Sequence, residues 1–550
     1  MFFDKFKQNS AFLIDKVSSK ALLILIFAYT IRVIYPDVHF AGGDYPGHVM
    51  ASLRLNDTFL FELKPLMNNL FAQIFEFNHG YTTIIFPYIL YKICFNIFGI
   101  PMNEASFVYI NSLIGIFSIF SVYLFVKEVF NKNIAIWTIL LVTVLPIHIG
   151  LSRVHVGTQI ISMAFFWLSL FFLSKLLKNN TTQYKLLYFI ITFFYIGSDN
   201  LFFIGLFFHL VFIYTKMDNY RGFVTTSNAI YKNLYILFIL IPVFTYITVA
   251  IISIRMNIEH GFLLRLFSKV DNGNNVNSGM YFGVYLKYIW IRLGVVGILS
   301  LPIIVIFIKK IFNKKELIFL FYYFLLFSFI VVIKGKTIES NYISFLSVPI
   351  VVFIVHFLRN RFLIILMFVS LLLSIKIVYN IPKIFTLNVT NYGSINHDIV
   401  NNNYGIKTLS YLVRKNILNI DKQEKRKHGI VKNKIALYLD YEGAWWYLGT
   451  RCYDWVIRDI NLTGSFKRFA IAIRESGFYS KRNEFLKMYV KNNKLYQFGY
   501  IVNKEQKLIT IYTNYKPESI NYYETNQYDI LFDEKYYNMK TFPKVWLGHF

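Results

Sequence analysis

The chain of 550 residues has few charged side chains and almost no cysteine. Asp, Glu, Lys and Arg make up 16% of the residues, whereas soluble globular domains contain about 25%. Hydrophobic residues reach 56% and the mean hydropathy is +0.47. The two cysteines, Cys94 and Cys452, permit no disulfide framework. The composition therefore excludes a disordered chain, a disulfide-rich module and a conventional soluble enzyme, and it favours a protein that crosses a bilayer many times.

The positive charge is unevenly distributed along the chain. The formal net charge is +27, with 31 basic residues up to position 380 and 26 in the 170 residues that follow. No motif for nucleic-acid binding accompanies these residues, and we expect no nucleic-acid partner. In a multispan protein, Lys and Arg mainly set the orientation and contact lipid head groups. The charge pattern predicts a membrane part, residues 1–380, followed by a soluble domain of ordinary polarity, residues 381–550.

About eleven apolar stretches are long enough to be considered as membrane spans, since a helix needs about 20 residues to cross the hydrocarbon. The first runs from Lys20 to Pro36. The others lie at 105–126, 133–150, 158–176, 186–197, 201–215, 233–254, 284–308, 316–333, 340–358 and 362–380. The short pair 186–197 and 201–215 is either two tilted spans or one re-entrant unit. The sequence thus predicts a mainly α, polytopic membrane protein.

Lys and Arg in the short connections set the predicted orientation. With a cytoplasmic N-terminus, the inner connections carry 18 basic residues and the outer ones carry 9. The apolar stretch 81–99 would invert this asymmetry if it crossed the membrane. We therefore assign it to a long first outer loop, residues 37–104, that lies in the membrane interface. The C-terminal domain then lies outside the cytoplasm.

The C-terminal domain combines strand and helix patterns. Short alternating apolar runs at 434–439 and 508–512 are typical of strands, and residues 404–418 favour a helix. These patterns predict a small α+β domain.

Carboxylates and histidines are concentrated at the start of the first outer loop. Asp37 and Asp44 follow the first span closely, and His48 comes directly after them. A carboxylate beside the hydrocarbon surface is partly desolvated, which makes it a better proton acceptor. The alternative is a polar turn in which Asp44 is the N-cap of an interfacial helix. Both interpretations remain open from spacing alone.

Three segments carry a resemblance to a known enzyme class. They are DYPGH at 44–48, PIHIGLSR at 146–153 after the helix pattern at 122–132, and a stretch with Lys, Tyr and Pro at 334–349. Their order and predicted sides resemble the GT-C class of polytopic glycosyltransferases, in the branch that includes protein O-mannosyltransferases and the aminoarabinose transferase of lipid A. Tyr45 replaces the Glu that this family has beside the leading Asp, and Thr158 stands where Asp is frequent. With two carboxylates fewer, the resemblance gives little support for a divalent metal, and we expect no cofactor.

The resemblance implies sugar transfer from a polyprenyl phosphate to a glycan, lipid or protein acceptor at the outer leaflet, with inversion at the anomeric carbon. Asp44 is the expected general base, and Asp37 is the second choice. Basic residues at the predicted outer ends of spans are candidates for binding the donor phosphate: Arg153, Lys334, Lys336, Arg255, Arg265 and Arg292. Candidates for substrate binding are His48, His155, Asp199, Asn200 and Tyr342. The histidines lack the spacing of a zinc site, so no metal site is predicted.

Two alternatives come from other functional classes. A transporter or flippase of lipid-linked glycans would show repeats or ionisable residues at the bilayer centre, and neither pattern is evident. A catalytically inactive membrane scaffold for envelope glycan assembly would keep the helices without needing the acid at position 44.

The predicted topology can be tested by chemical labelling. In a chain whose two native cysteines are replaced by serine, a cysteine introduced in place of Asp44 is expected to react with a membrane-impermeant maleimide added to intact cells. A cysteine in place of Lys314, in a predicted inner connection, is the control and is expected to react only after the cells are permeabilised. Labelling of position 44 only after permeabilisation would contradict the topology.

Overall fold

The structure is a computed structural model of the 550-residue chain. It describes residues 18–34, 82–100, 104–153, 158–198, 202–217, 282–334, 343–379, 405–427, 430–439, 467–475, 481–503 and 506–525. The predicted span at 233–254 lies outside these residues.

The chain divides into two compact units, each described here by itself. The helical unit comprises Met1–Tyr35, Glu62–Leu90 and Val108–Ile381, and the second unit comprises the remaining residues, including Pro382–Phe550. The second unit also includes Pro36–Phe61 and Tyr91–Phe107, so the domain bounds expected from the sequence, 1–380 and 381–550, stay predictions.

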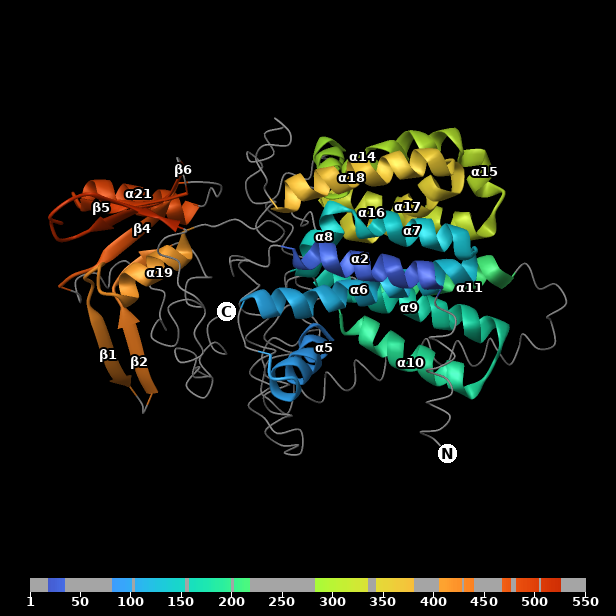
Figure 1. The fold of residues 1–550 in the computed structure, drawn as a ribbon, viewed down its shortest axis with the longest axis horizontal. Coiled ribbons are helices and arrows are strands. Elements are labelled where there is room, and N and C mark those ends of the chain that lie inside the picture. Colours follow the sequence, from blue (N-terminus) through green and yellow to red (C-terminus); the bar gives the residue numbers. More distant parts are fainter. Residues whose placement is uncertain are drawn as a thin grey trace. The chain divides into compact units, whose positions relative to one another are not determined.

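Helices account for all regular structure in the described part of the helical unit (Figure 1). Their bounds are α2 (Ser19–Val33), α5 (Thr82–Tyr91), α6 (Glu104–Val129), α7 (Lys132–Thr143), α8 (Pro146–Arg153), α9 (Thr158–Lys178), α10 (Thr182–Ile196), α11 (Phe202–Met217), α14 (Phe282–Ile306), α15 (Ile308–Phe312), α16 (Lys315–Lys334), α17 (Ser344–Phe357) and α18 (Asn360–Tyr379). Each predicted apolar stretch within the described residues is helical. A π-helix, η2 (Lys92–Ile97), follows α5 directly.

Few of the described helices meet the length and hydropathy expected of a full membrane span. Ala105–Val129 and Gln159–Lys178 do so, and α7 and α8 together form a further candidate that is bent by 66°. The other apolar helices, such as Ser344–Phe357, are shorter. The helical fold is therefore confirmed, while the number of spans and the interfacial position of residues 81–99 stay predictions.

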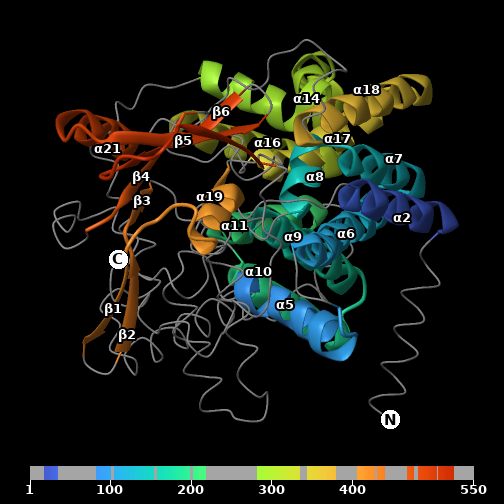
Figure 2. The ribbon, with the colours of Figure 1, turned by 60° about the vertical axis from the view of Figure 1, so that its left-hand side comes forward.

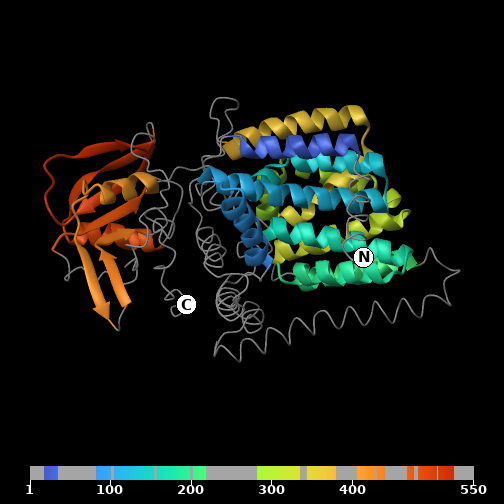
Figure 3. The same cartoon turned by 60° about the horizontal axis from the view of Figure 1, so that its bottom comes forward.

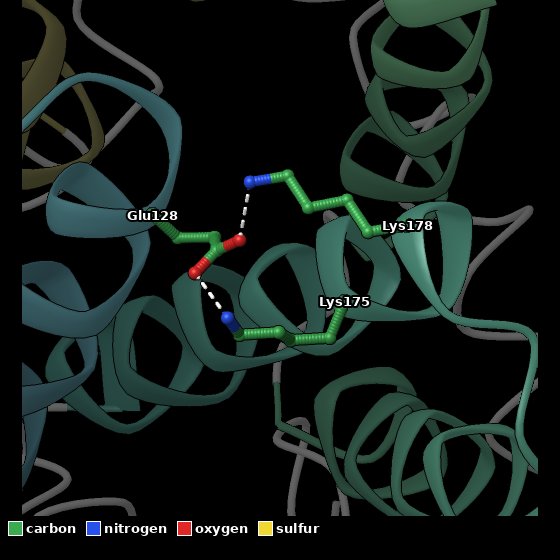
Figure 4. A network of polar contacts seen from close by, with 3 residues as sticks. All are labelled: Glu128, Lys175 and Lys178. Carbon is green, nitrogen blue, oxygen red and sulfur yellow. Dashed lines mark hydrogen bonds and ion pairs between the residues drawn. The ribbon is translucent and has the colours of Figure 1, made fainter. Parts of the chain in front are cut away.

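An ion-pair cluster joins the C-terminal ends of α6 and α9. Glu128 on α6 accepts from Lys178 Nζ at 2.6 Å and forms a second ion pair with Lys175 (Figure 4). Elsewhere, Lys314 Nζ lies 3.0 Å from Nε2 of His356 at the end of α17, whose ring also contacts Phe130. The three lysines, Lys175, Lys178 and Lys314, were predicted to lie in the cytoplasmic connections. The structure thus brings them together at one end of the helices, whereas the absolute orientation stays a prediction.

The core of the helical unit is rich in aromatic rings. Trp167 of α9 is fully buried and packs against Phe125 of α6 and Tyr323 of α16, with ring centroids 5.0 and 5.6 Å apart. Close packing of such large rings fixes the helices against one another without any need for polar contacts.

The second unit contains a mixed five-stranded sheet with the order β3-β4-β6-β5-β7 (Figure 2). Its strands are β3 (Leu437–Leu439), β4 (Ala470–Arg474), β5 (Tyr496–Asn503), β6 (Gln506–Thr513) and β7 (Asn521–Glu524). Two helices accompany the sheet, α19 (Ile406–Arg414) and α21 (Lys481–Asn492). The strand and helix patterns seen in the sequence are therefore confirmed, and the unit has α+β character.

A separate two-stranded ribbon is formed by β1 (Lys422–Lys427) and β2 (Ile430–Ile435), drawn in orange in Figure 3. The two strands pair antiparallel, with Lys425 opposite Lys432.

Gly405 directly precedes α19 and adopts a left-handed backbone with φ of +76°. A Cβ at this position would lie 2.7 Å from Cγ2 of Ile501. Glycine therefore allows the chain to enter α19 in contact with the sheet.

Candidate functional site

Arg32 lies in the last turn of α2 and is completely buried. Its Nε donates to Oγ of Ser152 at 2.7 Å, and its Nη1 donates to the carbonyl of Ala28 at 2.7 Å. Its Nη2 lies 3.4 Å from the carbonyl of Thr143 and 3.1 Å from Nδ1 of His148. A buried guanidinium is tolerated only when its donors are satisfied. Arg32 therefore links α2, α7 and α8, three helices that pack against one another (Figure 1).

The break between α7 and α8 provides acceptors for this arginine. A helix end leaves carbonyl groups without partners in the helix, and the axis turns by 66° between Thr143 and Pro146. Arg32 reaches the carbonyl of Thr143, and Ser374 Oγ of α18 donates to the carbonyl of Val144 at 2.5 Å. Pro146 begins α8, a position that suits its lack of an N–H group.

Gly115 brings α6 close to the same group of side chains. A Cβ at this position would lie 2.2 Å from Cβ of Ser152 and 3.4 Å from Nε of Arg32. Ser152 Oγ also donates to the carbonyls of His148 and Ile149, which fixes its rotamer. The absence of a side chain at 115 therefore leaves the space in which the Arg32–Ser152 hydrogen bond forms. We call Arg32, His148, Ser152 and Arg153 the arginine junction.

Arg153, a predicted donor-phosphate ligand, is the last residue of α8 and is 1% exposed. Its Nη1 donates to the carbonyls of Arg32 at 3.1 Å and Ile34 at 2.8 Å. The residue therefore caps the C-terminus of α2, where a positive charge also complements the helix dipole. The structure brings this predicted residue to the point where the chain leaves the first predicted span.

Arg292, another predicted phosphate ligand, lies on α14 and is 3% exposed. It precedes a kink at Gly294, whose φ of +61° and ψ of −144° are accessible only to glycine. Helix α14 packs against α8 and α18. Arg292 thus belongs to an element that contacts the helix of Arg153, and its role as a ligand stays a prediction.

Of the other predicted site residues, only Lys334 belongs to the described part of the chain. Lys334 is the last residue of α16, and only its backbone is described. The remaining ones lie outside the described residues: Asp37, Asp44, His48, His155, Asp199, Asn200, Arg255, Arg265, Lys336 and Tyr342. Among the residues that the structure describes, no group of three or more His, Cys, Asp or Glu side chains could hold a metal ion.

Sequence reasoning missed Arg32 and His148. A usable signal existed, because an ionisable residue inside an apolar span is by default a functional candidate. Arg32 lies inside the first predicted span, so it was not among the basic residues of the inner or outer connections. His148 was considered only as a residue of the PIHIGLSR segment. Their importance comes from their burial and from the partners they share, which lie more than a hundred residues apart in the chain.

An open apolar hollow of about 1020 Å³ lies between α11, α14 and α16. Its lining includes Phe207, Leu301, Leu325 and Phe329, and the last two are 44% and 56% exposed. The polar groups of Tyr285 and Ser328 in the lining are 2.7 Å apart and bond to each other. The hollow, which we call the apolar groove, therefore presents hydrocarbon to any ligand.

Residues 82–246 match the family described as dolichyl-phosphate-mannose-protein mannosyltransferase. This segment runs from α5 through the break between α7 and α8 to α11 and beyond. Over these residues the chain is similar to a family of GT-C mannosyltransferases. The resemblance inferred from the sequence is therefore confirmed for this segment.

Two solved structures are reported as similar to this chain, and only the first has a TM-score above 0.5. ArnT from Cupriavidus metallidurans, bound to undecaprenyl phosphate, matches with a TM-score of 0.55 at 10% identity over 91% of this chain and 99% of that chain. The oligosaccharyltransferase AglB from Archaeoglobus fulgidus, in complex with an inhibitory peptide and a dolichol-phosphate, matches with a TM-score of 0.44 at 13% identity over 72% of this chain. The chain spans 58% of the length of AglB.

A comparison with curated proteins gives no match. The relation to the GT-C class therefore rests on the family match, and the fold rests on the similarity to ArnT.

The space left by Gly115 can be tested by substitution. Gly115→Ala places a methyl group against Ser152 and is expected to lower the free energy of unfolding by about 1–3 kcal/mol, as overpacking does. Thermal unfolding of the purified protein in detergent measures the effect. The double variant Gly115→Ala/Ser152→Gly removes the clash and is expected to be more stable than the sum of the two single changes predicts. Additive effects would contradict the close approach of α6.

Proposed function

We propose that the chain is a membrane glycosyltransferase that moves a sugar from a polyprenyl-phosphate-linked donor to an acceptor at the outer face of the membrane. The observation that carries this proposal is the hydrogen bond from Arg153 to the carbonyl of Ile34. It holds a buried cation next to the origin of the loop that contains Asp37 and Asp44.

The short sequence distance between the arginine junction and the acids supports a shared site. Asp37 follows Ile34 by three residues, and an extended chain advances at most about 3.6 Å per residue. The covalent chain therefore keeps Asp37 within about 11 Å of the residue that Arg153 contacts. Asp44 lies ten residues after Ile34, so it has a wider reach.

The proposed reaction is an in-line displacement at the anomeric carbon. The carboxylate of Asp44, with Asp37 as the second candidate, accepts the proton of the acceptor hydroxyl. The acceptor oxygen forms a bond to the anomeric carbon while the bond from this carbon to the phosphate oxygen breaks. The lipid phosphate leaves with the bonding electrons, and the anomeric centre is inverted. The enzyme must therefore stabilise the negative charge that develops on the phosphate.

Basic residues at the predicted outer ends of the helices are suited to hold this phosphate. Arg153 and Arg292 are the two whose side chains are described, and both are buried on helices that pack together. Lys334, Lys336, Arg255 and Arg265 complete the proposed set. His48, His155, Asp199, Asn200 and Tyr342 are the proposed contacts to sugar and acceptor.

The apolar groove is suited to hold the prenyl chain of the donor. Its lining is hydrocarbon, with the exposed rings of Phe207 and Phe329 at its surface. Lipid tails are as apolar as this lining, so close packing against the rings is the expected source of binding. The C-terminal unit, residues 381–550, is assigned to recognition of the acceptor on the outer side.

The general base can be tested by removing its charge. Asp44→Asn is expected to reduce transfer from radiolabelled polyprenyl-phosphate sugars by about 10²–10⁴-fold, because the amide accepts no proton at neutral pH. Membrane insertion and thermal stability are expected to stay at the wild-type level. Asp37→Asn is the matched control and is expected to have the smaller effect.

If Asp44→Asn transfers sugar at the wild-type rate and Asp37→Asn does not, Asp37 is the general base. Transfer by neither the wild-type protein nor the variants, with any donor sugar, would favour the scaffold alternative.

The apolar groove can be tested by filling it. Leu325→Trp adds a large ring to the lining and is expected to weaken binding of undecaprenyl phosphate about tenfold. Leu299→Trp is the matched control, since Leu299 on α14 is a comparably exposed leucine (39%) that does not line the groove. Equal binding by the two variants would exclude the groove as the site of the prenyl chain.

A further inference from the structure

The hydrogen bonds of His148 define which of its ring nitrogens carries the proton. Nη2 of Arg32 lies 3.1 Å from Nδ1, and a guanidinium can only donate. Nδ1 is therefore the acceptor, and the proton of the imidazole resides on Nε2. Arg32 thus holds His148 as a neutral ring with a single N–H donor that faces away from the guanidinium.

Among the residues that the structure describes, this donor has no partner. His148 is 0% exposed, and its Nε2 atom makes no hydrogen bond to any part of the chain that the structure describes. Buried donors are rarely left in this condition, because the group has lost its bonds to water. The second nitrogen of the ring is, by contrast, firmly bonded. An oriented and unsatisfied N–H group is what a site completed by a ligand requires.

The charges around His148 indicate the chemistry of that ligand. Arg32 contacts the ring, and Arg153 follows five residues later on the same short helix. Both guanidinium groups donate only, as does Nε2 of His148. Such a set favours a group that is anionic and only accepts hydrogen bonds, which describes a phosphate. A sugar hydroxyl also needs an acceptor for its own proton, so it fits less well.

We infer that His148 donates a hydrogen bond from Nε2 to a phosphate oxygen of the polyprenyl-phosphate donor, and that Arg32 is the positioning residue that fixes the required tautomer. The inference rests on the proposed function for the identity of the lipid phosphate. It assigns His148, a member of the arginine junction, as a further ligand of the phosphate. The site is formed by α2, the break after α7, and α8, all within the helical unit.

The test measures binding of radiolabelled undecaprenyl phosphate to the purified full-length protein in detergent. His148→Leu removes the donor and is expected to weaken binding about 10- to 100-fold. His148→Gln is the matched variant, because its side-chain amide places an N–H group near the position of Nε2, and its binding is expected to stay within a few-fold of the wild type. Undecaprenol, which lacks the phosphate, is expected to bind all three proteins equally.

Inorganic phosphate distinguishes the lipid head group from a free anion. Inorganic phosphate is expected to compete with undecaprenyl phosphate only weakly, at concentrations far above that of the lipid. Efficient competition would identify a site for free phosphate and overturn the assignment to the donor lipid. Wild-type affinity of His148→Leu for undecaprenyl phosphate would overturn it as well, and would indicate that a buried water molecule satisfies Nε2.

The role of Arg32 is tested by combining substitutions. Arg32→Lys is expected to weaken lipid-phosphate binding in the wild-type background and to have little further effect in His148→Leu, because it acts through the ring. Purely additive losses would show that Arg32 does not act through His148.

The two proposals can fail separately. A protein that binds undecaprenyl phosphate through His148 and transfers no sugar contradicts the proposed function alone. A protein that transfers sugar while His148→Leu binds the lipid normally contradicts this inference alone.

Discussion

The burial of one guanidinium group organises the helical unit around its candidate site. Arg32 is completely enclosed, so each of its donors needs an acceptor inside the protein. The acceptors come from α2 itself, from the end of α7 and from α8. Removing any one of these elements would leave a buried charge partly unsatisfied. The position of α8, and with it the position of Arg153, therefore depends on Arg32.

The break between α7 and α8 supplies carbonyl acceptors that the buried Arg32 requires. A continuous helix would satisfy its own carbonyl groups and would offer nothing to Arg32. The break frees the carbonyls of Thr143 and Val144, and side chains from α2 and α18 bond to them. It also turns α8 so that Arg153 reaches the end of α2. In membrane proteins, irregular backbone of this kind is tolerated where protein surrounds it, and it frequently accompanies a binding site.

The arginine junction and the ion pairs of Glu128 lie at two different levels along helix α6. Gly115 and Glu128 lie on the same helix, thirteen residues apart, which corresponds to about 20 Å along the axis. The arginine junction lies beside Gly115, and the two lysines that pair with Glu128 lie at the C-terminal end of the same helix. The lysine-rich level is where the sequence places the cytoplasmic side, so the junction falls on the side assigned to the donor phosphate.

The sequence by itself determined the mainly helical class of fold and the resemblance to the GT-C enzymes. These properties follow from hydropathy, from charge density and from short motifs such as PIHIGLSR, all of which are local in the chain. The same local patterns located nearly every described helix, and they indicated Arg153. They could not indicate that the orientation of His148 depends on Arg32, which lies 116 residues away.

Only the tertiary structure decided which of the many basic residues are buried together, where a glycine makes room for them, and that Nε2 of His148 has no hydrogen-bond partner in the described part of the chain. These features depend on contacts between helices that are distant in the sequence, and a one-dimensional pattern of polarity carries no information about such contacts.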